Sequence, residues 1–186
     1  MNLHFTYGDK ATAIDIMREA ARWLIDSGKP MWSLDELADE AIVNPPEEFV
    51  VLWDGEESAA AMTLSYVDEL FWPEIPPGTS GFIHKLSVRR KYAGKGLAAL
   101  LVEHGKQICA DKGLRFLRLD CDPHREGLMS FYKACGFSLV EIKVINAYGM
   151  GKIDLAMFEM DCLAYSGCSP STGMEIIRPY HVSASL

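Results

Sequence analysis

The sequence lacks the cysteine patterns of metal centres and of folds stapled by disulfides. Its five cysteines are an odd number and contain no Cys-x-x-Cys pair. A disulfide framework needs an even set, and a structural zinc site needs closely spaced pairs. We therefore expect no metal, and reduced thiols that mostly fill the core, at Cys109, Cys121, Cys135, Cys162 and Cys168.

The sequence also lacks a long apolar run and an extended basic face. No segment approaches the roughly 20 apolar residues of a membrane span. The start of the chain, residues 1–4, has no basic residues leading into an apolar stretch, as a signal peptide would. The net charge of −8 argues against nucleic acid as the main partner. These absences predict a cytoplasmic protein that binds neither membranes nor nucleic acids.

Strands and helices alternate along the chain, and no internal repeat is visible. With 186 residues, of which 49% are apolar, the chain can bury one core without disulfides. Alternating apolar runs predict strands near residues 3–7, 48–53, 58–68, 82–88, 115–121, 137–145 and 153–160. This order of elements predicts a single α/β (α+β) domain.

Helices are expected where apolar side chains recur at helical spacing. The first ends at Gly28 and carries on its inner face Ile14, Met17, Ala21, Leu24 and Ile25. A second follows the capping box at residues 33–36, and a third covers about residues 97–112. The last begins with the N-cap Asp122 and Pro123 and ends at Gly136, which suits a left-handed C-cap.

The most informative segment is a basic loop with two glycines that joins a predicted strand to a predicted helix. It reads Val88-Arg89-Arg90-Lys91-Tyr92-Ala93-Gly94-Lys95-Gly96-Leu97-Ala98. Glycine lets neighbouring backbone N–H groups converge on one anion, and the following helix directs the positive end of its dipole there. A local group of cations in an acidic protein therefore indicates an anionic ligand of limited size.

Two better-known nucleotide loops are excluded by their spacing. The segment contains no GxxxxGK(S/T) sequence, and Gly94-x-Gly96 is followed by no third glycine at the Rossmann interval. A Rossmann-type oxidoreductase would also need a ribose-binding acid after that fingerprint. We therefore do not expect such an oxidoreductase.

Two separate segments resemble the GCN5-related N-acetyltransferases, the GNAT superfamily. The loop Ala93-Gly94-Lys95-Gly96-Leu97-Ala98 resembles their (Gln/Arg)-x-x-Gly-x-(Gly/Ala) acyl-CoA loop, although Ala93 stands where Gln or Arg is usual. The strand at 115–121, the following helix and Tyr132-Lys133-Ala134-Cys135-Gly136-Phe137 resemble their strand, helix and Tyr-x-x-x-Gly-Phe. The resemblance covers about residues 81–160.

This resemblance implies a fold, a cosubstrate and a set of contacts. The fold is a single GNAT domain at residues 1–162, a central mixed sheet of about seven strands flanked by helices, with two parallel strands that splay apart at the acyl-CoA site. Acetyl-CoA is the implied cosubstrate. The residues implied to bind it are Leu86, Ser87, Val88, Lys91, Ala93, Gly94, Lys95, Gly96, Leu97, Ala98 and Tyr132. Within this set, the backbone N–H of Leu86 is expected to donate to the thioester oxygen.

His84 is the candidate general base. Period-two alternation predicts that it shares a strand face with Leu86 and Val88, and an imidazole accepts a proton near neutral pH. The His-x-Leu-x-Val segment also resembles the arylalkylamine N-acetyltransferase branch, but Phe82 stands where that branch has a second histidine. Asp120, on the neighbouring strand, is the alternative base or a partner of His84.

The sequence thus predicts an acyltransferase of the EC 2.3.1 type, which transfers acetyl from acetyl-CoA to a primary amine of a small molecule or peptide by direct attack. Tyr132 is the expected general acid, because the family's tyrosine lies beside the CoA sulfur. The alternative is a non-catalytic acyl-CoA-binding regulatory module. Trp32, Phe71 and Trp72 are expected near the acceptor, whose identity stays open. The extension at 163–186 is expected to pack on the domain or to form a homodimer contact.

Overall fold

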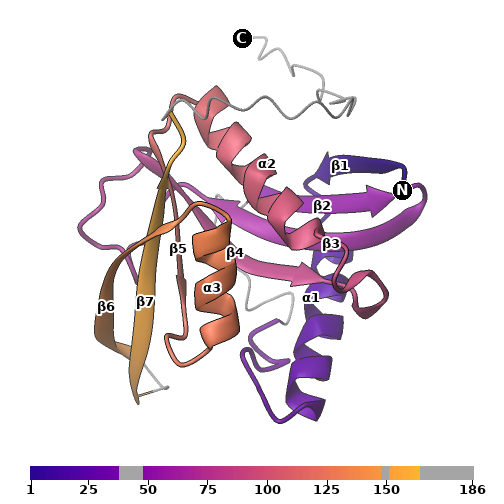
Figure 1. Ribbon diagram of the computed structural model, residues 1–186, viewed down its shortest axis with the longest axis horizontal. Helices are drawn as coiled ribbons and strands as arrows, with labels where there is room; N and C mark the ends of the chain where they lie inside the picture. Colours follow the sequence, from indigo (N-terminus) through magenta and orange to yellow (C-terminus); the bar gives the residue numbers. More distant parts are fainter. Residues whose placement is uncertain (38–47, 148–150, 164–186) are drawn as a thin grey trace, which may run out of the picture.

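The protein is one seven-stranded mixed sheet with helices on both faces (Figure 1). The computed structural model describes residues 1–37, 48–147 and 151–163. The strand order is β1-β2-β3-β4-β5-β7-β6, and β4 pairs with β5 in parallel while all other neighbours are antiparallel. The strands are β1 Leu3–Tyr7, β2 Glu48–Asp54, β3 Glu57–Ser65, β4 Ser80–Val88, β5 Phe116–Cys121, β6 Ser138–Ala147 and β7 Gly151–Asp161. The predicted mixed α/β sheet is confirmed.

Helices α1 and α2 cover opposite faces of this sheet. They span Lys10–Asp26 and Leu97–Asp111, and the shorter α3 spans Glu126–Ala134. Val51 and Ala61 pack with α1, whereas the neighbouring Leu52 and Ala60 belong to the core beneath α2. Because successive strand residues point to opposite faces, two separate apolar layers result.

Helix α1 begins as its sequence indicates but exposes one residue expected inside. The side chain of Asp9 accepts the N–H of Thr12 at 3.0 Å and caps the helix. Ile14 and Met17 are buried, but Ile25 is 42% exposed, so its predicted inward position is wrong. Ile25 lies in the last turn of α1, one residue before the helix ends.

Helix α3 starts later than predicted and ends where predicted. Asp122 does not cap it; its carboxylate instead accepts the N–H of His124 in a tight turn. At the other end Gly136 has a φ of +97°, and the N–H of Phe137 donates to the carbonyl of Tyr132 at 3.0 Å. This left-handed end confirms the predicted C-cap.

A third apolar cluster lies under the loop between β3 and β4. Trp72 from this loop is 3% exposed and packs with Phe82, Leu155 and Met157. Trp72 is therefore part of the core, and its expected place near the acceptor stays a prediction. Trp32 packs, partly buried, against the α1 cluster.

Several predictions from the sequence are only partly visible in the structure. Cys109, Cys121, Cys135 and Cys162 are free thiols and three of them are buried, whereas Cys168 lies outside the described residues. The capping bond from Glu36 N–H to Ser33 Oγ is present at 3.1 Å. The rest of that predicted helix, the turn at 148–150 and the extension from 164 onward also lie outside the described residues. No helix within the described ranges is long and apolar enough to cross a membrane.

Candidate active site

The parallel strands β4 and β5 separate before either one ends. Their last register pair joins Phe82 to Arg118, although both strands continue beyond it. The β4 backbone groups that face β5 after this pair therefore have no partner in that strand. Leu86, Ser87 and Val88 lie in this separated part. The splayed parallel strands that the resemblance implies are present.

A β-bulge interrupts the pairing of β4 with β3 in the same region. Ala61 pairs with Ser87 and Thr63 with His84, so one residue of β3 faces two residues of β4. Lys85 lies in this bulge with a φ of +52°. It is the one non-glycine residue with positive φ in the described part of the chain. Such a conformation is uncommon for a side chain other than Asn or Asp, and marks a backbone held by its surroundings.

Because of the bulge, the side chains of β4 that precede it lie on the face opposite to the one that strict alternation from Leu86 and Val88 would give. His84 shares its face with Ser87, whereas Leu86 and Val88 pack into the core beneath α2. The prediction that His84 shares a face with Leu86 and Val88 is therefore wrong, because the extra residue breaks the period of two. His84 points to the opposite side of the sheet, beneath the loop between β3 and β4.

The predicted cofactor loop folds into a short 3₁₀ turn, Arg90–Tyr92, followed by two left-handed glycines. Gly94 has a φ of +75° and Gly96 a φ of +80°, and Gly96 directly precedes helix α2. At either glycine, a Cβ would meet no heavy atom within 4 Å. The loop is thus shaped by backbone conformation and stays open to a ligand that approaches the backbone.

The backbone amides of this loop include several without a partner. The first hydrogen bond of α2 joins Leu100 N–H to the carbonyl of Gly96 at 3.1 Å. The amides of Leu97 and Ala98 precede this bond, as in the first turn of any helix. Within the described ranges, the amides of Gly94 and Gly96 also donate to no acceptor. The result is a short row of N–H donors at the positive end of a helix dipole.

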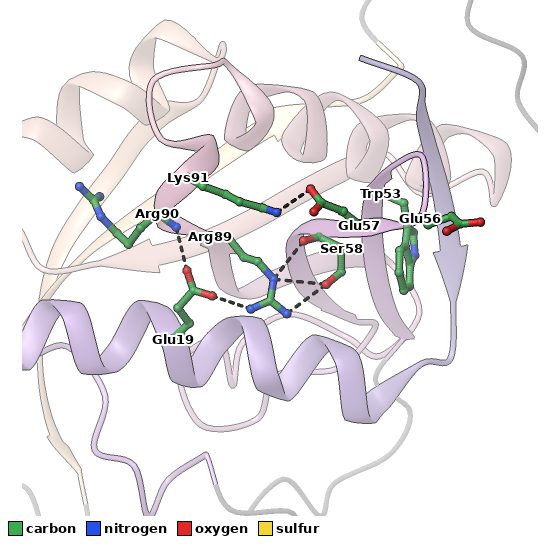
Figure 2. A pocket seen from close by; sticks show the side chains of 8 residues that line it. All are labelled: Glu19, Trp53, Glu56, Glu57, Ser58, Arg89, Arg90 and Lys91. Atoms are coloured by element: carbon green, nitrogen blue, oxygen red, sulfur yellow. Dashed lines mark hydrogen bonds and ion pairs between the residues drawn. The ribbon is translucent and has the colours of Figure 1, made fainter.

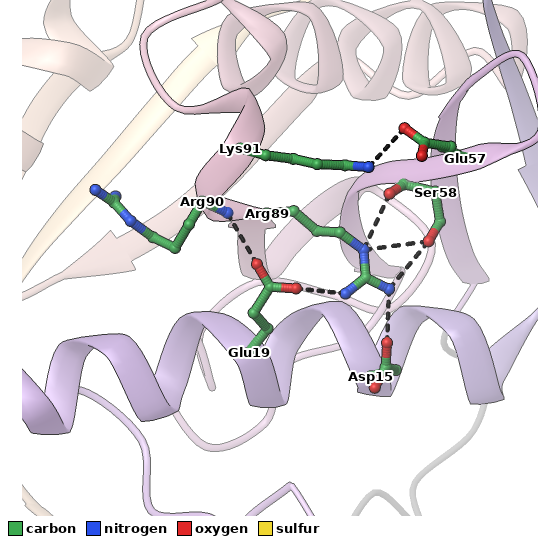
Figure 3. A network of polar contacts seen from close by, with 7 residues as sticks. All are labelled: Asp15, Glu19, Glu57, Ser58, Arg89, Arg90 and Lys91. Atoms are coloured by element: carbon green, nitrogen blue, oxygen red, sulfur yellow. Dashed lines mark hydrogen bonds and ion pairs between the residues drawn. The ribbon is translucent and has the colours of Figure 1, made fainter.

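Two basic side chains before the glycines, those of Arg89 and Lys91, are held by carboxylates (Figure 3). Arg89 donates to Glu19 at 2.5 Å and to Asp15 at 2.6 Å, which ties the loop to α1. The ammonium of Lys91 lies 2.5 Å from a carboxylate oxygen of Glu57. The predicted contact of Lys91 with a phosphate would require it to leave Glu57, and stays a prediction.

An open hollow of about 630 Å³ lies on the α1 side of this loop (Figure 2). Carboxylates and cations line it together, at Glu19, Trp53, Glu56, Glu57, Ser58, Arg89, Arg90 and Lys91. None of the predicted catalytic residues reaches it. We therefore assign the hollow to the ion-pair network that anchors the loop and not to the reaction centre.

Three titratable side chains meet on the face of the sheet opposite α2. Asp68 comes from the loop after β3, His84 from β4 and Asp120 from β5, beyond the last β4–β5 pair. One nitrogen or oxygen of each lies within 4.8 Å of the other two. His84 Nε2 is 3.8 Å from Asp68 Oδ2 and 3.2 Å from Ser65 Oγ. Such a set can exchange protons, and its donor atoms are also of the kind that binds divalent cations.

Burial shifts the two predicted bases of this cluster in opposite directions. Burial, with a smaller effect of the Lys85 charge, lowers the pKa of His84 to about 4. Burial and the nearby charge of Asp68 raise the pKa of Asp120 to about 7. At neutral pH the imidazole is therefore uncharged and weakly basic, whereas the carboxyl of Asp120 is close to its titration midpoint.

Tyr132 lies on α3, near the end of β5 that carries Asp120 and Cys121. Its side chain is 8% exposed and its ring packs against Phe131, Phe137 and Phe158. Its hydroxyl forms no hydrogen bond with any described residue. Burial raises the pKa of Tyr132 above its usual value, with smaller contributions from Cys121 and Asp120, so the phenol keeps its proton at neutral pH.

Asp68 is the member of the cluster that reasoning from the sequence missed. The sequence suggested that it ends the strand at 58–68, but β3 ends at Ser65. Asp68 then starts a turn in which its Oδ1 accepts the N–H of Phe71 at 3.0 Å. An aspartate that precedes Phe71-Trp72-Pro73 is a turn signal, but nothing local shows that the turn lies over β4 and β5.

Comparison with known proteins supports one family. The sequence model of the acetyltransferase (GNAT) family matches residues 14–137. Over 147 residues, 72% of this chain and 79% of the other, the sequence is 29% identical to the uncharacterized N-acetyltransferase YesJ of Bacillus subtilis (strain 168).

Solved structures with the same fold have been crystallised with acetyl-CoA or CoA. A GNAT family acetyltransferase from Elizabethkingia anophelis with acetyl-CoA bound superposes with a TM-score of 0.57 at 16% identity, over 86% of this chain and 98% of that one. A Bacillus subtilis acetyltransferase in complex with CoA superposes with a TM-score of 0.59 at 19% identity, over 86% of this chain and 98% of that one.

Proposed function

The chain belongs to the acetyltransferase (GNAT) family, and from this premise we propose that it transfers the acetyl group of acetyl-CoA directly to a primary amine. The observation that carries the proposal is the buried carboxyl of Asp120, with a pKa of about 7, beside the point where β4 and β5 separate. A group with that pKa can take a proton from an ammonium at physiological pH and return it to water.

The glycine loop and the splayed strand suit the phosphates and the pantetheine arm of acetyl-CoA. The unpaired amides of Gly94, Gly96, Leu97 and Ala98 would hold the pyrophosphate, and open space at the glycines allows close approach. Ala93 precedes these donors and Lys95 lies between the two glycines, and the amides of both bond back to the 3₁₀ turn. A Gln or Arg side chain at position 93 is therefore not needed for contacts that the backbone makes.

The separated part of β4 would hold the acyl arm. Backbone groups of Leu86 and Val88 point to the side from which β5 has separated and are available to an extended ligand, whereas those of Ser87 face its β3 partner Ala61. The N–H of Leu86 would donate to the thioester oxygen, where negative charge develops as the amine attacks. Acetyl-CoA would supply the activated acetyl group.

Asp120 suits the role of general base better than His84 does. The conjugate acid of His84 has a pKa of about 4, so its imidazole is a poor acceptor for the proton of an ammonium. Asp120 is matched to neutral pH. We therefore assign proton removal to Asp120, with His84 as a neutral neighbour that completes the cluster.

Tyr132 would complete the proton balance. Asp120 removes one proton from the ammonium, and the amine nitrogen forms a bond to the thioester carbon. As the C–S bond breaks, the Tyr132 hydroxyl gives its proton to the departing thiolate. The new amide nitrogen then loses its remaining excess proton, which restores the phenol.

The direct test is a turnover screen of primary amines with acetyl-CoA, measured as release of free thiol. We expect time-dependent release with at least one amine and a product heavier by one acetyl group. Release that does not depend on the amine would indicate only hydrolysis. Tight binding of acetyl-CoA without turnover on any amine would favour the alternative, a non-catalytic acyl-CoA-binding module.

Tyr132→Phe tests the proton donor. We expect kcat to fall about a hundredfold while the Kd for acetyl-CoA stays nearly constant, because the ring still packs against Phe137 and Phe158. Stopped-flow turnover and calorimetry measure the two quantities. Phe131→Leu, which removes a neighbouring aromatic contact, is the packing control. Equal losses of rate and affinity in Tyr132→Phe would assign the tyrosine to packing.

A further inference from the structure

Asp68 carries a buried oxygen that the fold leaves without a partner. Its side chain is 5% exposed, and its Oδ2 forms no hydrogen bond within the described ranges. A buried polar atom of this kind costs free energy unless it serves another purpose. The atom points into the cluster that contains His84 and Asp120.

The two oxygens of Asp68 have different surroundings. Burial raises the pKa of Asp68, but hydrogen bonds from the backbone amides of Phe71 and Leu70 oppose this, and Oδ1 accepts the first of them. Asp120 has one such bond, from its own backbone amide, and its side chain makes no hydrogen bond to another described residue. When two close carboxyls hold one proton, it therefore resides on Asp120, and Asp68 stays charged.

We propose that Asp68 and Asp120 act as one carboxylate pair, in which Asp68 is a positioning residue and Asp120 receives the proton of the acceptor amine. The proposal rests on the function proposed above and extends it to a residue outside the family motifs. Close carboxylates disfavour a second negative charge, so Asp68 keeps the proton affinity of Asp120 high enough for neutral pH.

The other groups around Asp120 act in known directions. From β4, the charge of Lys85 lowers the pKa of Asp120, and His84 is neutral above about pH 5. From α3, Tyr132 stays protonated. Burial raises the pKa of the adjacent thiol of Cys121 to about 12, so it also stays neutral. Asp68 is thus the neighbouring anion whose removal should lower the pKa of Asp120.

Asp68→Asn is the decisive variant. Asparagine retains an oxygen for the N–H of Phe71 and removes only the charge. We expect the pKa of the Asp120 carboxyl to fall by about one unit, as read from its carboxyl carbon in NMR titrations assigned with Asp120→Asn. The acid limb of the kcat profile should move to lower pH by the same amount. An unchanged Asp120 titration in folded Asp68→Asn would overturn the proposal.

Two further variants separate a charge effect from a structural one. Glu69→Gln removes the same charge at the adjacent, exposed position and should leave the titration of Asp120 in place. Lys85→Asn removes the opposing charge, and asparagine tolerates positive φ, so the pKa of Asp120 should rise. If the pKa of Asp120 moved in the same direction in Asp68→Asn and Lys85→Asn, the proposed carboxylate pair would also be overturned.

The NMR titration separates failure of this inference from failure of the proposed function. It needs no turnover, so it reports on the pair even if no amine is acetylated. A shifted Asp120 titration in a protein without acetyl transfer would keep the pair and remove the proposed function. If the wild type transfers acetyl but the acid limb of the kcat profile does not move in Asp68→Asn, the proposed function would stand and the carboxylate pair would be removed.

Discussion

Asp120→Asn should lower kcat about a thousandfold and leave acetyl-CoA binding intact. Asparagine has nearly the same shape but cannot take a proton, so the loss should match that of a general base. The rate that remains should no longer rise through the pKa of about 7 that Asp120 has in the wild type. Turnover at several pH values, with calorimetry for affinity, measures both effects. Full activity in Asp120→Asn would reassign the base.

The same variant should be more stable than the wild type at high pH. The pKa of Asp120 is about 7 when folded, above its usual value of 3.8, so the folded state holds the proton longer than the unfolded chain does. Wild-type stability therefore falls as the pH rises from about 4 to about 7, and by about 4 kcal/mol at most for a shift of this size. Asparagine does not titrate and avoids this loss.

Thermal unfolding at two pH values tests this linkage. The Tm of Asp120→Asn should exceed that of the wild type at pH 8, and the difference should shrink towards pH 4. Asp111→Asn, at the exposed end of α2, is the control and should show no such pH-dependent gain. A constant Tm difference across this range would mean that Asp120 is not protonated in the folded protein at neutral pH.

Gly96→Glu should abolish binding of CoA. Gly96 has a φ of +80° and directly precedes helix α2, so glutamate would add backbone strain and a negative charge beside the row of unpaired amides. Calorimetry with CoA should detect no binding to the variant, a loss of at least a hundredfold if the phosphates contact these amides.

Gly113→Glu is the matched control for that variant. Gly113 follows the other end of α2, has a φ of +73°, and likewise would place its Cβ in open space. The two variants therefore share the backbone strain and the added charge and differ in position. We expect similar losses of Tm in both and loss of CoA binding only in Gly96→Glu. Equal affinities would refute the role of the loop as a phosphate site.

The segments that the sequence predicted best are those whose structure is determined locally. Gly136 after α3 has the left-handed conformation predicted from its place behind the helix, and Gly96 directly precedes α2, as the predicted order of glycine loop and helix requires. Asp122 shows the limit of such signals, because an aspartate before proline suits a turn as well as a helix cap, and here it forms a turn.

The parts that the sequence did not predict depend on contacts between distant segments. Asp68 joins the cluster only because the loop after β3 lies over β4 and β5. The partner of Lys91 is Glu57, on β3, and no spacing along the chain indicates this pair. The face on which His84 lies depends on one extra residue opposite β3, which an alternating pattern does not reveal.

The bulge in β4 also means that this strand has one residue more than its pairing with β3 needs. Deletion of Lys85, with residues 86–88 still paired to β3, would leave Leu86 opposite Met62 and His84 opposite Thr63. The imidazole would keep its face, and the strand would lose only its residue with positive φ. Deletion of both His84 and Lys85 would instead bring Ile83 opposite Thr63, so that an isoleucine would face the two carboxylates. We therefore expect β4 to tolerate the loss of one residue at the bulge but not of two, since the second deletion exchanges the core side of the sheet for the side that carries the carboxylates.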